Sequence, residues 1–135
     1  MLIGDGELKT EIISLVCNKK LDSFVKFIGT TDRVMDYYNA MDMVLMPSLF
    51  EGLGIVALEA QRNGVPIVIS DKLPPEAIVA NNIYAISLSK SDKEWADIIL
   101  NHLDISRKDN ANLFKNSVYD MNTMMIRVRS ILIDD

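Results

Sequence analysis

Cysteine, histidine and long apolar runs are scarce in this 135-residue sequence, and each scarcity excludes a class of protein. The single cysteine, Cys17, cannot form an internal disulfide, and the single histidine, His102, cannot build a zinc site alone. No apolar run approaches the roughly 18 residues that a membrane span requires. The first residues have neither the basic start nor the long apolar stretch of a signal peptide. We therefore expect a cytoplasmic protein.

Basic residues are also in the minority, with 14 Lys and Arg against 19 Asp and Glu, and the net charge is −5. The longest basic cluster is Lys19-Lys20, which argues against a protein that binds nucleic acid through its phosphates. Hydrophobic residues make up 49% of the sequence. A chain of this length and content suits one globular domain over residues 1–135 and is not comfortably enough for two.

The apolar residues switch between extended and helical spacing along the chain. They predict the end of a strand at 1–3, strands at 25–28, 43–46, 66–70 and 84–88, and helices at 7–19, 34–41, 55–63, 76–80 and 91–103. The segment 106–133 is expected to be mostly helical, with a break near 119–120. The segments 43–46 and 66–70 are apolar, as is typical of strands covered on both faces. This alternation predicts an α/β fold with a parallel sheet and helices on both of its faces.

The first three residues have the pattern of a strand that is already ending, because the turn Gly4-Asp5-Gly6 follows them at once. This beginning predicts an N-terminally truncated chain whose upstream part is missing. The alternative is a short first strand in a complete protein.

The segment from Pro47 to Glu59 carries the clearest signal for a binding site, because a glycine-containing turn leads there from an apolar strand into a helix. In open α/β sheets, ligands bind at such turns. Gly52 and Gly54 would let a ligand approach the backbone, and the amides near Leu53, Gly54 and Ile55 would face an anion such as phosphate at the helix N-terminus. These positions are the first group of candidate binding residues.

Two carboxylates bracket this turn. Glu51 lies in the loop, and Glu59 lies one turn into the helix on the face of Ile55, with its side chain leaning toward the N-terminus. Because a carboxylate can accept hydrogen bonds from two hydroxyls, the pair would suit a molecule with hydroxyls on both sides of its phosphates, such as a nucleotide sugar. Spacing alone leaves open that both are only solvated charges near a helix end.

The glycine turn at Gly4-Asp5-Gly6 also follows a strand and precedes a helix, as the start of a dinucleotide-binding fingerprint does. Lys9 stands where that fingerprint requires glycine or alanine, which argues against a nicotinamide-dependent dehydrogenase. Either a tight turn near a ligand or simply a tight turn fits this segment.

The spacing Glu51-x7-Glu59, preceded by Pro47-Ser48 and followed by Gly64-Val65-Pro66, resembles the donor-binding half of the family-4 retaining glycosyltransferases of the GT-B fold. Other markers precede the glutamate pair in the family's order: Ile3-Gly4-Asp5-Gly6, Val25-Lys26-Phe27-Ile28-Gly29 and Tyr38-x-x-Met41-Asp42. The downstream features resemble the bacterial exopolysaccharide and O-antigen subgroup: Ile69-Ser70-Asp71-x-x-Pro74-Pro75-Glu76, the Trp95-Ala96 helix and Val118-Tyr119-Asp120.

The resemblance implies a Rossmann-like domain that binds a nucleotide sugar, with UDP as the expected nucleotide. Glu59 would hold the ribose hydroxyls, and Glu51, the implied catalytic residue, would contact the transferred sugar. Backbone amides at positions 52–55 would meet the sugar and the diphosphate. The base would pack near Ile28, Gly29 and Thr30, and Gly4 and Gly6 would lie at the donor site.

The resemblance also implies a metal-independent enzyme without a further cofactor. A missing N-terminal domain would bind a saccharide or lipid-linked saccharide acceptor, and only the full-length enzyme would contact the inner membrane face. The family's basic residues for the diphosphate would lie upstream, so this chain alone would not turn over. Two alternatives stay open: another GT-B enzyme, such as a UDP-sugar epimerase, and a non-catalytic nucleotide-binding module.

Overall fold

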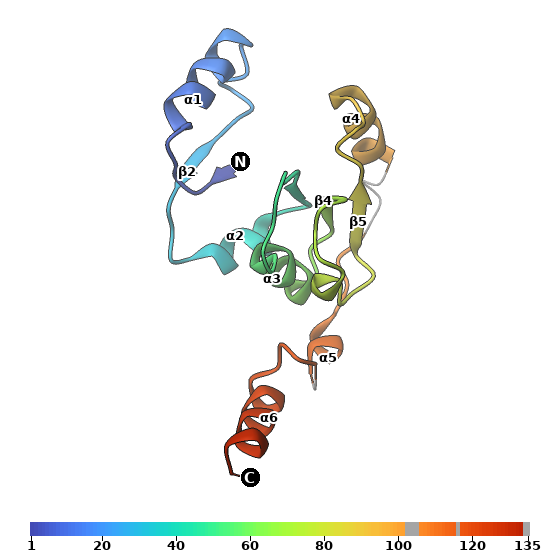
Figure 1. Cartoon of the computed structure of the whole chain (residues 1–135). Coiled ribbons are helices and arrows are strands. Elements are labelled where there is room, and N and C mark those ends of the chain that lie inside the picture. Colours follow the sequence, from blue (N-terminus) through green and yellow to red (C-terminus); the bar gives the residue numbers. More distant parts are fainter. Residues whose placement is uncertain (102–105, 116, 134–135) are drawn as a thin grey trace. The chain divides into compact units, whose positions relative to one another are not determined.

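Strands and helices alternate through most of the computed structural model, which describes residues 1–101, 106–115 and 117–133 (Figure 1). His102 and the end of the helix predicted for 91–103 lie outside the described residues. The elements in chain order are β1 (Leu2–Ile3), α1 (Lys9–Asn18), β2 (Phe27–Gly29), α2 (Val34–Ala40), β3 (Val44–Met46), α3 (Ile55–Asn63), β4 (Ile67–Ser70), the 3-10 helix η1 (Pro75–Ala77), β5 (Ile83–Ile86), α4 (Asp92–Asn101), α5 (Ala111–Phe114) and α6 (Met121–Ile133).

The chain forms two compact units, Met1–Asp36 and Tyr37–Asp135, which we call unit 1 and unit 2. In unit 1, β1 pairs with β2 in parallel. In unit 2, β3, β4 and β5 form a parallel sheet in that order. The predicted α/β class with parallel strands is confirmed, although the strands form two sheets instead of one. The assignment of residues 1–135 to one domain stays a prediction.

The core of unit 2 is built around β4, the central strand. Its residues Ile67, Val68 and Ile69 are at most 1% exposed, as expected for an apolar strand covered on both faces. The same prediction is wrong for β3, where Leu45 is 52% exposed. An apolar sequence does not by itself ensure such cover, because the cover comes from elements that pack over each face of the sheet, and in β3 only Met46 is buried.

Helix α3 packs against β4 and ends as the sequence predicts. Ala57, Leu58 and Ala60 are buried, and Figure 1 shows the helix beside the sheet of its own unit. Gly64 follows in the left-handed conformation with φ +79°, which permits the C-cap hydrogen bonds from its backbone N–H. The sheet and α3 together position the loop between β3 and α3.

A buried glutamine changes the structure expected after β4. The sequence predicts a helix over 76–80, whereas η1 ends at Ala77. The amides of Val79 and Ala80 donate to Gln61 Oε1 at 2.9 and 3.0 Å, and Gln61 Nε2 donates to the carbonyls of Ala57 and Ala77. The side chain of Gln61 therefore takes the place of the backbone acceptors that a longer helix would have supplied.

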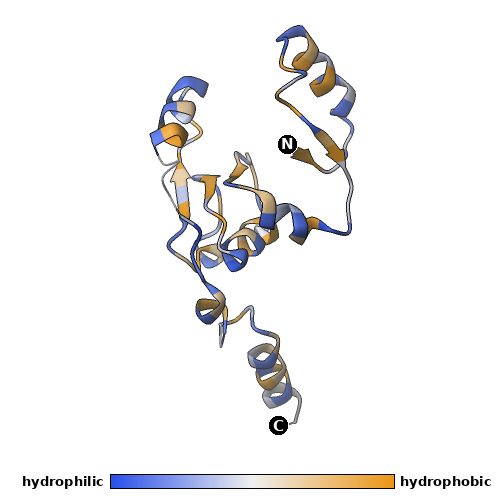
Figure 2. Cartoon of the chain, turned by 180° about the vertical axis from the view of Figure 1, so that it is seen from behind, coloured by the Kyte–Doolittle hydropathy of each residue, from blue (hydrophilic) through white to orange (hydrophobic). Residues whose placement is uncertain are grey.

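Most of 106–133 is helical in α5 and α6, as the sequence predicts, but the segment 106–110 is not. Its residues form hydrogen bonds with other parts of unit 2 instead: Lys108 N donates to the Gly64 carbonyl at 3.1 Å, and Asn110 Nδ2 donates to Asn82 Oδ1 at 2.8 Å. The predicted break near 119–120 is confirmed, because Asp120 caps α6 by accepting from the amide of Thr123. Along α6, hydrophobic and hydrophilic residues are interspersed (Figure 2).

Helix α4 begins with a reciprocal cap. Ser91 N and Oγ both donate to the carboxylate of Glu94, and these bonds lower the pKa of Glu94 to about 2. Trp95 Nε1 donates to the Ser87 carbonyl just after β5 and ties the helix to that strand. Among the described residues, no helix combines the length and the apolar character needed to cross a bilayer.

Candidate functional site

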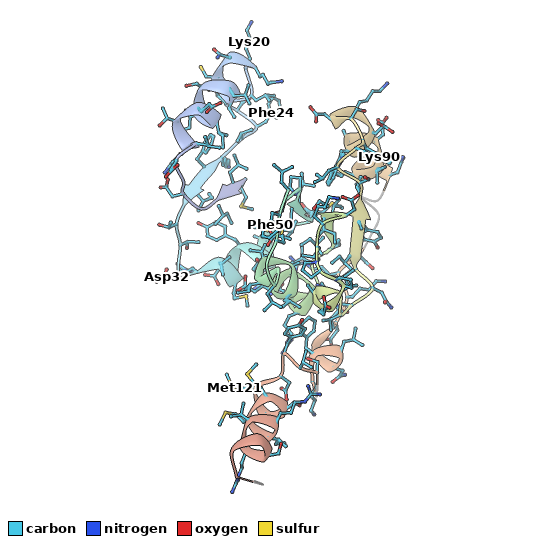
Figure 3. All side chains as sticks on the ribbon, viewed as in Figure 1. Lys20, Phe24, Asp32, Phe50, Lys90 and Met121 are labelled. Atoms are coloured by element: carbon cyan, nitrogen blue, oxygen red, sulfur yellow. The ribbon has the colours of Figure 1, made fainter. Side chains whose placement is uncertain are left out.

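The candidate site in unit 2 is the loop between β3 and α3, which begins where β3 ends. Ser70, the last residue of β4, donates through Oγ to the Ser48 carbonyl at 2.6 Å and ties this loop to the neighbouring strand. The loop therefore lies at the carboxyl edge of a parallel sheet, where α/β proteins bind ligands. Phe50, labelled in Figure 3, belongs to this loop and is 87% exposed.

The first turn of α3 offers backbone donors. Gly54 precedes the helix in the left-handed conformation, and no side chain caps this end. The first amides of a helix have no intrahelical acceptor and lie at the positive end of its dipole. An anion placed here would accept hydrogen bonds from them, as the sequence predicts for the amides near Leu53 and Ile55.

Gly52 and Gly54 have different structural reasons to be glycine. The φ of Gly54 is +73°, a conformation that favours glycine, and a Cβ there would lie 2.4 Å from Leu73 Cδ1, so the Leu73 side chain would have to shift. A Cβ at Gly52 would meet nothing within 4 Å. Of these two glycines, Gly52 is therefore the one whose missing side chain leaves room beside the backbone, as the close approach of a ligand would require.

The two glutamates differ in what they contact. Glu51 is half-buried and makes no hydrogen bond or ion pair with any described residue. Glu59, also half-buried, accepts a hydrogen bond at Oε2 from the hydroxyl of Tyr38 at 3.1 Å. Both carboxylates thus keep acceptor capacity for ligand hydroxyls, and one of them is already oriented by the protein.

Tyr38 also belongs to the site, although the sequence indicates it only as part of the motif Tyr38-x-x-Met41-Asp42. It is 3% exposed, and burial, together with the negative charge of Glu59, raises its pKa well above the ordinary value for tyrosine. The phenol therefore stays protonated and able to donate. Its partner is 21 residues away in the sequence, and no local pattern indicates that contact.

In unit 1, the structure brings together two of the predicted glycines. Gly4 N donates to the Gly29 carbonyl at 2.8 Å, and both residues have positive φ. A pocket of about 270 Å³ is lined by residues that include Gly4, Asp5 and Gly6. Hydrogen bonds from Lys9 and from the Gly6 amide hold the pKa of the Asp5 carboxyl below its usual value. Asp5 thereby stabilises the turn itself, and Lys9 is its ion-pair partner.

The predicted site residues fall into two groups, each described within its own unit. Unit 2 holds Glu51, Gly52, Leu53, Gly54, Ile55 and Glu59; unit 1 holds Gly4, Gly6, Ile28, Gly29 and Thr30. That all of them contribute to one donor site stays a prediction. The same holds for metal independence, although the described residues contain no group of three or more His, Cys, Asp or Glu side chains that could hold a metal ion.

Comparison with known families gives a match over most of the chain. The model of the family described as "Glycosyl transferases group 1" matches residues 1–117. EpsF from Bacillus subtilis (strain 168) is 37% identical over 100 residues, which cover 73% of this chain and 26% of EpsF. The O-antigen biosynthesis glycosyltransferase WclY from Escherichia coli is 37% identical over 71 residues, covering 53% of this chain and 20% of WclY.

A solved structure confirms the fold. The crystal structure of Anabaena Alr3699/HepE in complex with UDP and glucose matches with a TM-score of 0.80 and 23% identity, covering 99% of this chain and 40% of that one. The chain thus spans less than half of the solved relative and about a quarter or less of the two curated ones.

Proposed function

The chain belongs to the group 1 glycosyl transferases, and from this premise we propose that it is the donor-binding part of a UDP-sugar-dependent, retaining family-4 hexosyltransferase. The proposed product is a bacterial surface polysaccharide, such as an exopolysaccharide, a capsule or an O-antigen. WclY, named for O-antigen biosynthesis, and the Anabaena structure with UDP and glucose support this choice of substrate and pathway.

One observation carries the proposal: the first turn of α3, which has no side-chain cap, lies between Glu51 in the preceding loop and Glu59 within the helix. Amides there would donate to the diphosphate oxygens of the donor. The carboxylate of Glu59 would accept from the ribose hydroxyls, and that of Glu51 from hydroxyls of the transferred sugar. The absence of a side chain at Gly52 would let the sugar approach the backbone, because a Cβ there would project into open space that the sugar could otherwise occupy.

The chemistry assigned to this part is binding and charge stabilisation. As the bond between the sugar and the diphosphate breaks, negative charge grows on the departing diphosphate. Helix amides stabilise that charge without a divalent metal, together with basic side chains from the rest of the enzyme. A second domain would supply the acceptor, so we propose that this chain binds the donor but does not turn over alone. We also propose a cytoplasmic location, where nucleotide sugars are available.

The prediction that tests the role of Glu51 is selective loss of sugar recognition. In Glu51→Ala, the affinity for UDP should stay unchanged, because Glu51 is assigned no contact with the nucleotide. The affinity for the UDP-sugar that binds best, chosen among UDP-glucose, UDP-galactose and UDP-N-acetylglucosamine, should fall about tenfold or more, as for the loss of a hydrogen bond to a charged acceptor. Isothermal titration calorimetry measures both affinities.

Glu11→Ala is the matched control, because Glu11 is an exposed glutamate on α1 and its removal changes the net charge equally. It should leave both affinities unchanged. Equal weakening of UDP and UDP-sugar in Glu51→Ala, or no weakening of either, would contradict the assignment of Glu51 to the sugar.

A further inference from the structure

The buried phenol of Tyr38 lies against the glutamate assigned to the ribose. Its hydroxyl donates to Glu59 Oε2 at 3.1 Å, and the Val56 carbonyl, one turn earlier in α3, lies at 3.4 Å. The phenol has one proton to donate, and the carboxylate is both the closer acceptor and the charged one. Tyr38 therefore holds Oε2 of Glu59, while Oε1 has no partner among the described residues.

The position of Tyr38 does not depend on this hydrogen bond. Arg107 donates to the backbone carbonyls of Tyr38 and Met41 at the end of α2, and to Oδ1 of Asn63 at the end of α3. Asn63 Nδ2 also donates to Asn39 Oδ1 at 3.4 Å. These contacts fix the end of α2 against α3, so the ring of Tyr38 is placed by the backbone and by burial.

The orientation of Glu59, in contrast, rests on that one bond. Its side chain is half-buried, has several rotatable bonds and forms no ion pair with the described residues. A glutamate without a partner samples several rotamers, and binding a ligand that requires one of them costs free energy for that ordering. A neutral phenol that keeps its proton, as the raised pKa of Tyr38 ensures, removes this cost before the ligand arrives.

We propose that Tyr38 is a positioning residue, which holds the Glu59 carboxylate with Oε1 free to accept from the ribose hydroxyls of the donor nucleotide. The inference rests on the proposed function, because it takes Glu59 as the ribose ligand. Tyr38 itself touches no substrate in this scheme and acts only through Glu59.

The test is Tyr38→Phe, which deletes the hydroxyl and keeps the ring. The affinity for UDP should fall about three- to tenfold, as the ordering cost returns. The affinity for 2′,3′-dideoxy-UDP, which lacks the ribose hydroxyls, should not change. Tyr37→Phe is the matched control, because it deletes the same hydroxyl from the neighbouring tyrosine, and it should leave both affinities unchanged.

A double-mutant cycle separates positioning from a general structural effect. In a Glu59→Ala background, Tyr38→Phe should cause no further loss of UDP affinity. Equal loss for UDP and its dideoxy analogue, or an undiminished loss in the Glu59→Ala background, would overturn the positioning role.

The same titrations distinguish this inference from the proposed function. If Glu59→Ala weakens UDP and Tyr38→Phe does not, only the role of Tyr38 is wrong. If Glu59→Ala leaves UDP affinity unchanged, the ribose assignment of Glu59 is wrong, and the role of Tyr38 with it. If neither this chain nor the same chain extended upstream binds UDP, both the proposed function and the role of Tyr38 are wrong.

Discussion

The substitution Gly64→Ala is expected to destabilise unit 2 strongly, although it adds only one methyl group. A Cβ on Gly64 would lie 1.9 Å from the carbonyl oxygen of Lys108, which is backbone and cannot rotate away. The φ of +79° adds the strain of a left-handed alanine. Together these terms should cost roughly 2–5 kcal/mol of unfolding free energy. The thermal unfolding midpoint, followed by circular dichroism, should drop by about 10 °C or more.

The destabilisation should also come from hydrogen bonds that the segment around Lys108 and Asn110 forms with the rest of unit 2. Lys108 N donates to the Gly64 carbonyl, and Asn110 from the same segment donates to Asn82 Oδ1 and to the Gln61 carbonyl. Displacing this segment therefore breaks buried hydrogen bonds as well. Gly52→Ala is the matched control for stability, because its Cβ would meet nothing within 4 Å, and its midpoint should stay within about 2 °C. Equal midpoints for the two variants would contradict the packing of this segment against α3.

The largest expected effect on binding belongs to Glu59→Ala. Removal of the carboxylate deletes the acceptor for the ribose hydroxyls and leaves the Tyr38 hydroxyl only its longer contact, 3.4 Å from the Val56 carbonyl. Hydrogen bonds to charged groups contribute about 1.5–3 kcal/mol, so the affinity for UDP should fall roughly 10- to 100-fold. Titration calorimetry with UDP measures the loss directly.

The control for this variant is again Glu11→Ala, which should bind UDP as the parent chain does. Because the ribose is common to UDP and UDP-sugars, Glu59→Ala should weaken both by the same factor. If Glu59→Ala lowered only the affinity for UDP-sugar, Glu59 would have the role assigned to Glu51, and the two assignments would have to be exchanged. Unchanged affinity for both ligands would remove Glu59 from the donor site.

Much of the fold follows from local sequence patterns. The sequence predicts the helix at 55–63 with the bounds that the structure shows, because apolar spacing is a local signal. The prediction for 76–80 is wrong because the acceptor for the amides of Val79 and Ala80 is the side chain of Gln61, which is 18 and 19 residues away. The helical part of 106–133 leaves out 106–110 for a similar reason, since the partners of that segment are Gly64 and Asn82.

In the candidate site, too, the sequence predicts the features that depend on neighbouring residues and not those that depend on residues far apart in the chain. The glycine turn and the Glu51 and Glu59 pair are visible as spacing, and the structure confirms that the turn leads into a helix without a side-chain cap. The sequence alone does not distinguish Gly54, whose positive φ favours glycine, from Gly52, where a Cβ would meet nothing within 4 Å. The contact between Tyr38 and Glu59 depends on how α2 meets α3, and sequence spacing carries no information about it.

The most direct test of donor binding is calorimetric titration of the chain, and of the same chain extended upstream, with UDP, GDP and ADP. The proposed function predicts that UDP binds in preference to GDP and ADP, more tightly where upstream basic residues join the site. Binding by the extended chain alone would still support a UDP site and would place essential cations upstream. If neither protein prefers UDP, the assignment of this chain to a UDP-sugar donor site is wrong.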